Sequence, residues 1–195
     1  MTRCYAGECA KRPFKRELIQ QARISPGQQV LDIGCGTGTL TVLVKQTHPA
    51  AEVVGLDGDP NVLAIARAKA SKAGVDIRWD HGMAFELPYA DRSFDRALTS
   101  LVLHHLTTEN KQRALRETWR VLQPGGELLV LDFGKPGSLY GRLLAFLGQR
   151  LEEVADNIKG LLPNMLRGAG FDPVNQQTRY TTIVGDLWLI RGHKP

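Results

Sequence analysis

Short apolar segments alternate along this chain with segments whose apolar residues recur every three or four positions. The first kind predicts buried β-strands and the second predicts amphipathic helices. Strands are predicted over Gln29–Ile33, Glu52–Asp57, Asp76–Asp80, Phe94–Ser100 and Glu127–Phe133, and helices over Thr39–Thr47, Asn61–Ala73 and Glu109–Leu122. Regular alternation of strand and helix favours an open, doubly wound α/β sheet of mostly parallel strands.

The pattern changes after residue 133. Apolar residues recur at helical spacing over 139–151, and a further short helix is predicted over Leu161–Ala169. Two strands, Asp172–Val184 and Asp186–Arg191, follow around a turn, and so short a link predicts an antiparallel pair that closes the sheet. No repeat or linker is evident, so 1–195 is interpreted as a single domain: a cap over 1–27, a core over 28–133 and a remainder over 134–195.

Composition narrows the class of protein. Apolar residues make up 43% and charged residues 23% of the chain, which is ordinary for a globular domain. No apolar run is long enough for a transmembrane helix, and the N-terminus lacks the apolar region of a secretory signal. The three cysteines, Cys4, Cys9 and Cys35, have neither disulfide-framework nor metal-site spacing, and the histidines are scattered. We therefore expect a reduced, cytoplasmic protein without a bound metal.

The net charge of +5 is concentrated in two flanking segments. Residues 1–27 hold six basic and two acidic side chains, and residues 134–150 hold three basic and none acidic, whereas residues 28–133 are net acidic. A nucleic-acid interface usually interleaves basic and aromatic side chains, and aromatics are only 7% of this chain. One interpretation is a solvated basic face; the other is attraction of an anionic substrate or membrane surface.

The strongest local signal is VLDIGCGTG, a buried strand that leads into Gly34, Gly36 and Gly38 and then into a helix. Glycines allow a sharp turn and let a ligand lie against bare backbone. A dinucleotide-binding loop has the spacing G-x-G-x-x-G and a phosphate-binding loop ends in Gly-Lys, and this loop has neither form. Asp32, just before the loop, would repel a pyrophosphate and suits a cationic ligand.

Asp57 ends the second predicted strand, nineteen residues after Gly38. A carboxylate there can accept from both hydroxyls of a ribose, because its two oxygens match two vicinal donors. Nicotinamide enzymes share this feature. Together with Asp32 and the tight glycine spacing, it indicates a nucleoside with a positively charged tail.

Four motifs in order resemble a known family: VLDIGCGTG, VVGLD, LPYADRSFDRALTSLVLHHL and RVLQPGGELLVLDF. The chain is similar to class I S-adenosylmethionine-dependent methyltransferases, in particular the ubiquinone/menaquinone C-methyltransferase-like group. The resemblance runs from about Val30 to Phe133. It implies a Rossmann-like, seven-stranded sheet whose last strand is antiparallel. It also implies S-adenosylmethionine as cofactor and S-adenosylhomocysteine as product.

The resemblance also implies a role for individual residues. It implies that the glycine loop, including Cys35, lies against the methionine and ribose of the cofactor. Asp32 would lie near the methionine amino group, and Asp57 would accept from the ribose hydroxyls. It implies Gly58 beside the adenine, and Ser100 and Leu101 near the methionine end. The family usually has Gly-Asp-Ala after the third strand, and this chain has Gly82-Met83-Ala84. Met83 can stack on a purine but cannot accept from its amino group; Asp80 is the nearest substitute.

Methyl transfer from a sulfonium is a displacement from an activated donor, so positioning supplies much of the catalysis. A base helps only where the acceptor carries a proton that must leave early. The candidates are His104 and His105, for which the alternative is a role in orienting the following helix; Tyr140 is a weaker candidate. Residues 135–151 also form a basic amphipathic pattern that is typical of contact with a membrane surface.

These observations favour a methyltransferase acting on a small-molecule acceptor, amphiphilic or anionic, such as a quinone precursor or a phospholipid headgroup. A soluble metabolite is a further option. The alternatives are a non-catalytic S-adenosylmethionine-binding protein, kept open by Met83, and a nicotinamide-dependent oxidoreductase, disfavoured by the loop spacing. Nucleic-acid methylation is disfavoured, because Ser100-Leu101-Val102-Leu103 stands where an N-P-P-Y-type tetrapeptide would be expected.

Overall fold

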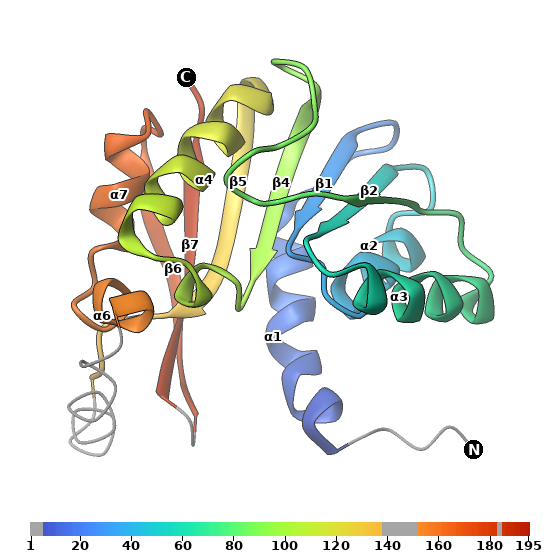
Figure 1. Ribbon diagram of the computed structural model, residues 1–195, viewed down its shortest axis with the longest axis horizontal. Coiled ribbons are helices and arrows are strands. Elements are labelled where there is room, and N and C mark those ends of the chain that lie inside the picture. Colours follow the sequence, from blue (N-terminus) through green and yellow to red (C-terminus); the bar gives the residue numbers. More distant parts are fainter. Residues whose placement is uncertain (1–5, 138–151, 183–184) are drawn as a thin grey trace.

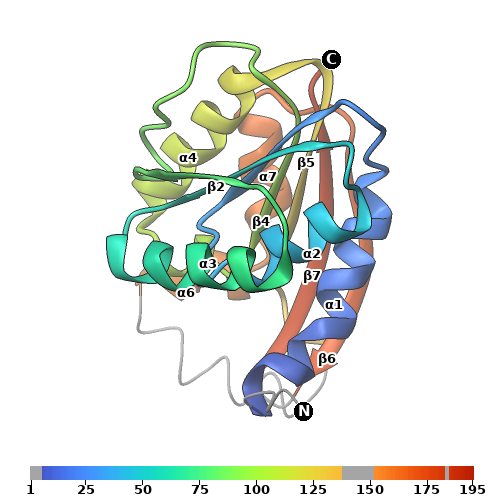
Figure 2. The same ribbon diagram turned by 90° about the vertical axis from the view of Figure 1, so that its right-hand side faces the viewer.

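The computed structural model describes residues 6–137, 152–182 and 185–195, which form one twisted sheet with helices on both faces (Figures 1 and 2). The helix predicted within 139–151, including Tyr140, and most of the basic amphipathic pattern lie outside the described residues. Among the helices described, none is long and apolar enough to cross a membrane.

Seven described strands form the sheet, in the order β3-β2-β1-β4-β5-β7-β6. β7 lies between β5 and β6 and runs antiparallel to both, whereas the other neighbouring pairs are parallel. The predicted fold class, including the antiparallel closing pair, is confirmed. The strands are β1 (Gln29–Ile33), β2 (Glu52–Asp57), β3 (Arg78–His81), β4 (Phe94–Ser100), β5 (Leu122–Phe133), β6 (Val174–Thr182) and β7 (Gly185–His193).

The helices divide between the two faces of the sheet. Buried residues of α1 and α2 share one apolar cluster with the sheet, and buried residues of α4 and α7 share the other. α3 packs beside α2 near the β3 edge of the sheet. The helices are α1 (Ala6–Ala22), α2 (Thr39–Thr47), α3 (Pro60–Ala73), α4 (Thr108–Val121), α6 (Glu152–Ile158) and α7 (Leu162–Gly168), with a short 3-10 turn, η1 (Leu103–His105).

The N-terminal cap is a helix that belongs to the core. Leu18, Ile19 and Ala22 of α1 are buried against the sheet together with residues of β4 and β5. The α1 end is also tied to the closing strand, because the Arg191 guanidinium donates to the Gln21 carbonyl. The predicted cap is therefore part of one packed unit with the sheet.

Four strands have bounds that differ from the prediction. β6 begins at Val174 rather than at Asp172, and β7 spans Gly185–His193 rather than Asp186–Arg191. β3 begins at Arg78 rather than at residue 76, because Ile77 is used to bury the α2–α3 contact. β5 begins at Leu122 rather than at Glu127, since Leu122 already pairs with Phe94 and the Gly125 N–H bonds to the Lys194 carbonyl.

Candidate functional site

The glycine loop connects β1 to α2 at the carboxyl edge of the sheet. Gly34, Gly36 and Gly38 all have positive φ, at 67°, 54° and 71°. A Cβ on Gly34 would lie 2.5 Å from a Val102 methyl carbon, and one on Gly38 would lie 2.6 Å from the Trp79 ring. A Cβ on Gly36 would meet nothing within 4 Å. Two of the glycines therefore permit close packing, and the middle one borders open space.

Asp57, at the end of β2, is held by backbone donors on both carboxylate oxygens. The Gly36 N–H donates to Oδ2 over 2.7 Å, and the Asp59 N–H donates to Oδ1 over 3.0 Å. Each carboxylate oxygen has a further lone pair, so the oriented group can accept from two more donors. Asp57 and the glycine loop, which were both expected to contact the ligand, are therefore joined directly by a hydrogen bond.

A pocket of about 330 Å³ opens between the loop and the ends of β2 and β4. Its volume lies within the range of small-molecule sites. Seven of the residues expected at the cofactor site line it, together with the candidate base His105: Gly34, Gly36, Asp57, Gly58, Met83, Ala84 and Leu101. The other lining residues are Leu56, Gly82, Phe85, Val102 and Leu106.

Five lining residues were not singled out from the sequence. Each of them directly adjoins a predicted residue in the chain, and Gly82 also belongs to the Gly82-Met83-Ala84 run; Leu56 has no other signal in the sequence. Val102 lines the pocket because its side chain packs against Gly34. That contact joins two loops far apart in sequence, so only the folded chain reveals it.

Met83 lies over the backbone beside Asp57. Its side chain is half exposed, and its sulfur would lie 2.8 Å from a Cβ on Gly58. Asp80, the proposed substitute for the missing acidic side chain, does not line the pocket. It accepts from the Tyr89 hydroxyl over 3.0 Å and pairs with Arg78. The adenine end of the predicted site is therefore bounded by a thioether.

Asp32 and Cys35 do not line the pocket. Asp32 is 1% exposed, and its Oδ2 accepts from the Thr41 hydroxyl over 2.6 Å. Burial raises the pKa of Asp32 to about 6, partly offset by the Thr41 hydrogen bond and by Lys15. Burial, and next the charge of Asp32, raise the pKa of the Cys35 thiol well above its ordinary value, so the thiol stays protonated.

The methionine end of the predicted site has a strained backbone. Leu101 has φ 60°, a left-handed conformation that is costly for a residue with a Cβ. Its N–H donates to the Leu131 carbonyl over 2.8 Å, which fixes the turn after β4. The preceding Ser100 has a buried hydroxyl without a partner. Strain together with an unsatisfied polar group is characteristic of functional sites.

The two candidate histidines lie in η1, with their ring centroids 4.0 Å apart. His105 lines the pocket; burial, and next the neighbouring His104, lower its pKa. His104 does not line it, and its Nδ1 lies 2.8 Å from Oδ1 of Asp132. Since a carboxylate only accepts, His104 donates from Nδ1, which leaves the Nε2 lone pair available.

Asp132 was not among the predicted residues. It is the penultimate residue of β5, is 1% exposed, and accepts from the backbone N–H groups of Val102, Leu103 and Phe133. The fully buried Asn157 also donates to it, over 3.2 Å. The carboxylate thus fixes the turn after β4 as well as the His104 ring.

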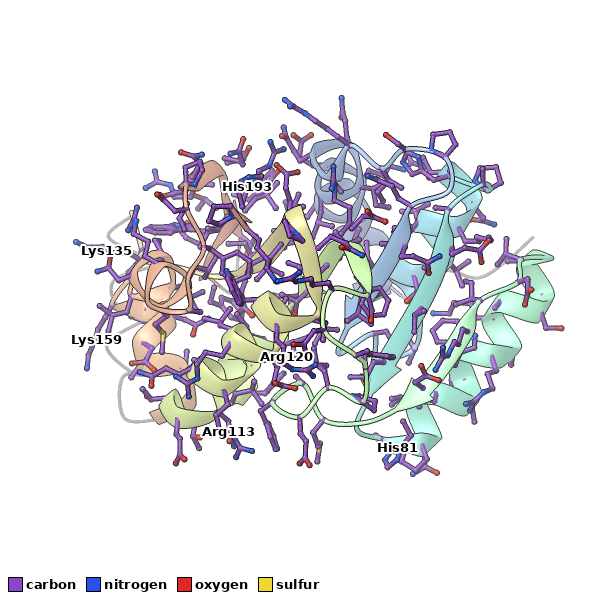
Figure 3. The ribbon with its side chains drawn as sticks, turned by 90° about the horizontal axis from the view of Figure 1, so that it is seen from above. His81, Arg113, Arg120, Lys135, Lys159 and His193 are labelled. Atoms are coloured by element: carbon purple, nitrogen blue, oxygen red, sulfur yellow. The ribbon has the colours of Figure 1, made fainter. Side chains whose placement is uncertain are left out.

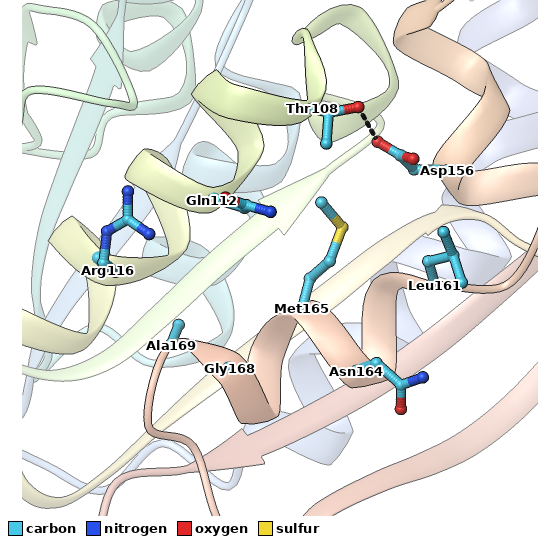
Figure 4. Close-up of a pocket in the computed structure, with 9 residues that line it drawn as sticks. All are labelled: Thr108, Gln112, Arg116, Asp156, Leu161, Asn164, Met165, Gly168 and Ala169. Carbon is cyan, nitrogen blue, oxygen red and sulfur yellow. Dashed lines mark hydrogen bonds between the residues drawn. The ribbon is translucent and has the colours of Figure 1, made fainter.

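A second pocket, of about 390 Å³, lies between α4, α6 and α7 (Figure 4). Thr108 donates to Asp156 at one end, and Arg116 stands at the other. It includes none of the glycine-loop residues, so it is separate from the predicted cofactor site. In the described part of the chain, no group of three or more His, Cys, Asp or Glu residues is placed to hold a metal ion.

Comparison with known proteins adds to this geometry. Residues 30–126 match the family described as "Methyltransferase domain". The chain is 37% identical over 144 residues to demethylmenaquinone methyltransferase of Thermus thermophilus, covering 69% of this chain and 64% of the relative. It is 34% identical over 207 residues to the ubiquinone/menaquinone biosynthesis C-methyltransferase UbiE of Vibrio cholerae, covering 94% of this chain and 78% of the relative. The chain thus spans less than two thirds of the Thermus protein.

One solved structure with a similar fold is the YcgJ protein from Bacillus subtilis. Its TM-score is 0.77, with coverage of 94% of this chain and 98% of that one. The sequence identity is 19%, so this likeness concerns the fold alone.

Proposed function

The chain belongs to the same methyltransferase family as the ubiquinone/menaquinone biosynthesis C-methyltransferases, and from this premise we propose that it methylates a quinol-type small molecule with S-adenosylmethionine. One observation carries the proposal: Asp57 and the glycine loop are joined by a hydrogen bond at the wall of a single pocket. The relatives named above supply the acceptor class.

The pocket fits the cofactor that the family uses. Gly36 presents backbone to open space, and Asp57 offers two oriented acceptor oxygens for the ribose hydroxyls. Gly58 and Met83 would border the adenine, and Leu101 the methionine end. When bound, S-adenosylmethionine supplies a methyl group on a positively charged sulfur.

The low pKa of His105 suits this pocket. A neutral imidazole at the wall does not repel a cationic ligand, whereas an imidazolium would. The neighbouring His104 would have a different role. Its hydrogen bond to Asp132 orients a ring whose Nε2 can accept a proton.

A base in η1, next to the pocket residue His105, would serve a quinol acceptor. The ring carbon would form a bond to the methyl group as the carbon–sulfur bond breaks, which would release S-adenosylhomocysteine. The hydrogen on that carbon would then move as a proton to the ring oxygen and restore the aromatic quinol. The ring hydroxyl must lose its proton early to make that carbon nucleophilic, and we assign the proton to His104 Nε2. Asp132 is then a positioning residue, since it acts through His104.

The test is a methyl-transfer assay with isotopically labelled S-adenosylmethionine. The acceptors are a short-chain demethylmenaquinol, kept reduced, and vesicles of phosphatidylethanolamine. Labelled methylquinol supports the proposal. Label found in phosphatidylethanolamine alone would contradict the quinol assignment and identify a phospholipid headgroup as the acceptor. Binding of S-adenosylmethionine without turnover of either acceptor would contradict the proposed activity and favour a non-catalytic binder.

A further inference from the structure

A strongly basic pocket lies outside the proposed active site, between α1, α2 and α3. It has a volume of about 420 Å³ and four cationic lining residues: Lys15 and Arg16 from α1, and Lys69 and Lys72 from α3. No carboxylate lines it. Its remaining lining residues are Thr39, Val42, Leu43, Gln46 and Ala73.

One of these cations is held in position. The Lys69 ammonium donates to the Thr39 hydroxyl over 2.6 Å and to the Thr37 hydroxyl over 3.2 Å. Thr37 belongs to the glycine loop, so the basic pocket lies behind the loop that borders the proposed cofactor pocket. A side chain ordered before a ligand arrives loses less conformational entropy when the ligand binds.

The other side of the pocket is open to solvent. Arg16 and Lys72 are exposed, and neither forms an ion pair with any residue that the structure describes. Positive charges that converge from two helices repel one another, and an anion between them removes that repulsion. The charge of the pocket therefore calls for a negatively charged occupant.

The pocket continues along the α1–α2 contact. A neighbouring pocket of about 480 Å³ shares Arg16 and Leu43 with it and adds Ile19 and His48. The added lining also includes the polar residues Gln20 and Thr47, so the groove is cationic at one end and mostly polar, with the apolar Ile19, at the other. This arrangement fits a charged group that carries an organic part. Among the residues that the structure describes, neither pocket is lined by Phe, Tyr or Trp, and His48 is the only lining residue with an aromatic ring on which a nucleic-acid base could stack.

We infer that this basic pocket is an anion site for a phosphate group, carried either by a soluble phosphate or by a phospholipid headgroup. A phosphate offers several acceptor oxygens and up to two negative charges to cations that approach from different helices. The site is distinct from the proposed methyl-transfer pocket, so its occupancy is measured without S-adenosylmethionine or an acceptor.

The test compares two double variants of equal net charge. Arg16→Gln/Lys72→Gln removes the two exposed cations of the basic pocket and leaves Lys69 and its threonine partners unchanged. Arg116→Gln/Lys159→Gln removes two exposed cations elsewhere. Arg116 lines the α4–α7 pocket (Figure 4), and Lys159 projects from the opposite side of the molecule from α3 (Figure 3). Thermal unfolding establishes that each variant is folded. If Arg16→Gln/Lys72→Gln is not, the single variant Lys72→Gln replaces it, and if the control is not, Lys159→Gln replaces it.

Inorganic phosphate and pyrophosphate are titrated calorimetrically at low salt. We expect both to bind the unchanged protein, with binding at least about tenfold weaker in Arg16→Gln/Lys72→Gln and unchanged in the control. Equal weakening in both variants would mean that only the net charge of the protein matters, and it would overturn the inference. Absence of binding by every probe would overturn it as well.

Vesicles identify the source of the phosphate. Phosphatidylglycerol and phosphatidylcholine vesicles are sedimented with the protein, with and without excess pyrophosphate. Retention on phosphatidylglycerol that pyrophosphate displaces, and that Arg16→Gln/Lys72→Gln lacks, assigns a headgroup. Binding of pyrophosphate without retention on vesicles assigns a soluble phosphate. Retention that persists equally in Arg16→Gln/Lys72→Gln would place the membrane contact elsewhere and overturn the headgroup assignment.

Discussion

The backbone N–H of Gly36 donates to Oδ2 of Asp57 across the ends of two neighbouring strands. The bond joins the middle of the glycine loop to the carboxylate that ends β2. Because Asp57 also accepts from the Asp59 N–H, its plane is fixed before any ligand binds. The loop and the carboxylate therefore form one preorganised wall of the pocket.

Replacing Asp57 by Ala should abolish measurable binding of S-adenosylmethionine and S-adenosylhomocysteine. The variant also leaves two backbone donors without their acceptor, at a cost to the free energy of unfolding of about 1–3 kcal/mol. Calorimetric titration measures the binding and denaturant unfolding measures the stability.

Asp59→Ala provides the matched control for Asp57→Ala. Asp59 caps α3 through the Asn61 N–H and does not line the pocket. Its loss should cost about 1 kcal/mol of stability and leave cofactor affinity unchanged. If Asp57→Ala binds both ligands as tightly as the unchanged protein, the assignment of Asp57 is wrong. Binding of NAD in their place would favour an oxidoreductase.

The glycines of the loop should differ in what their replacement damages. Gly36→Ala meets open space, so its cost to folding is the left-handed backbone alone, about 1–2 kcal/mol. Its new methyl group stands at the wall of the cofactor pocket and should weaken binding of S-adenosylhomocysteine. Gly38→Ala has the same backbone cost and also drives a methyl group into Trp79 and Ala66, for about 1–3 kcal/mol more. Denaturant unfolding and calorimetry on both variants distinguish the two effects; equal stability would contradict the packing argument.

The pKa of Asp32 predicts a pH-dependent stability. Its folded value of about 6 lies above the ordinary 3.8, so the folded state holds the proton more tightly than the unfolded state. The resulting contribution is full below pH 3.8 and is lost as pH rises through 6, a change of about 3 kcal/mol. Asp32→Asn keeps an acceptor for Thr41 and removes the titration. The difference in free energy of unfolding between the unchanged protein and this variant should decline from pH 4 to pH 7; parallel profiles would refute it.

The parts of the site that the sequence predicts are those fixed locally. The glycine loop and Asp57 each follow a buried strand, and parallel strands bring their carboxyl ends to one edge. The role of Asp132 could not be predicted, because its partners lie in the turn after β4 and on α6. These two segments are far apart in the sequence and meet only in the fold. Asp32 does not line the pocket, because packing decides whether a side chain lies above or beneath a loop, and here the hydrogen bond from Thr41 holds it beneath.

Met83 gives a prediction about adenine recognition. The resemblance to class I methyltransferases implies an acidic side chain here, and the thioether is a much weaker acceptor for the adenine amino group than a carboxylate. Met83→Asp should therefore tighten binding of S-adenosylhomocysteine by about tenfold, the value of one hydrogen bond to a charged acceptor. Binding of S-inosylhomocysteine, which lacks that amino group, should not improve. Met83→Leu is the apolar control, and equal gains for both ligands in Met83→Asp would contradict the assignment.

Variants of His104 and Asp132 should change the rate of methyl transfer without changing the affinity for the cofactor product. If His104 Nε2 accepts the acceptor's proton, His104→Gln should lower kcat by about 10²–10³-fold while the affinity for S-adenosylhomocysteine stays unchanged. Asp132→Asn should also lower kcat, because an amide can present its NH₂ group to Nδ1 and favour the wrong tautomer. It should destabilise the fold as well, since Asp132 anchors the turn after β4.

A pH profile distinguishes catalysis from structure in these variants. The unchanged enzyme should lose kcat at low pH, where a proton on Nε2 removes the base, and His104→Gln should lack that acidic limb. His105→Gln is the matched control, because it alters the neighbouring imidazole and leaves the Asp132 contact in place. An acidic limb that survives in His104→Gln would leave His104 with the structural role of orienting η1, and the proton would then leave to solvent or to a group on the acceptor itself.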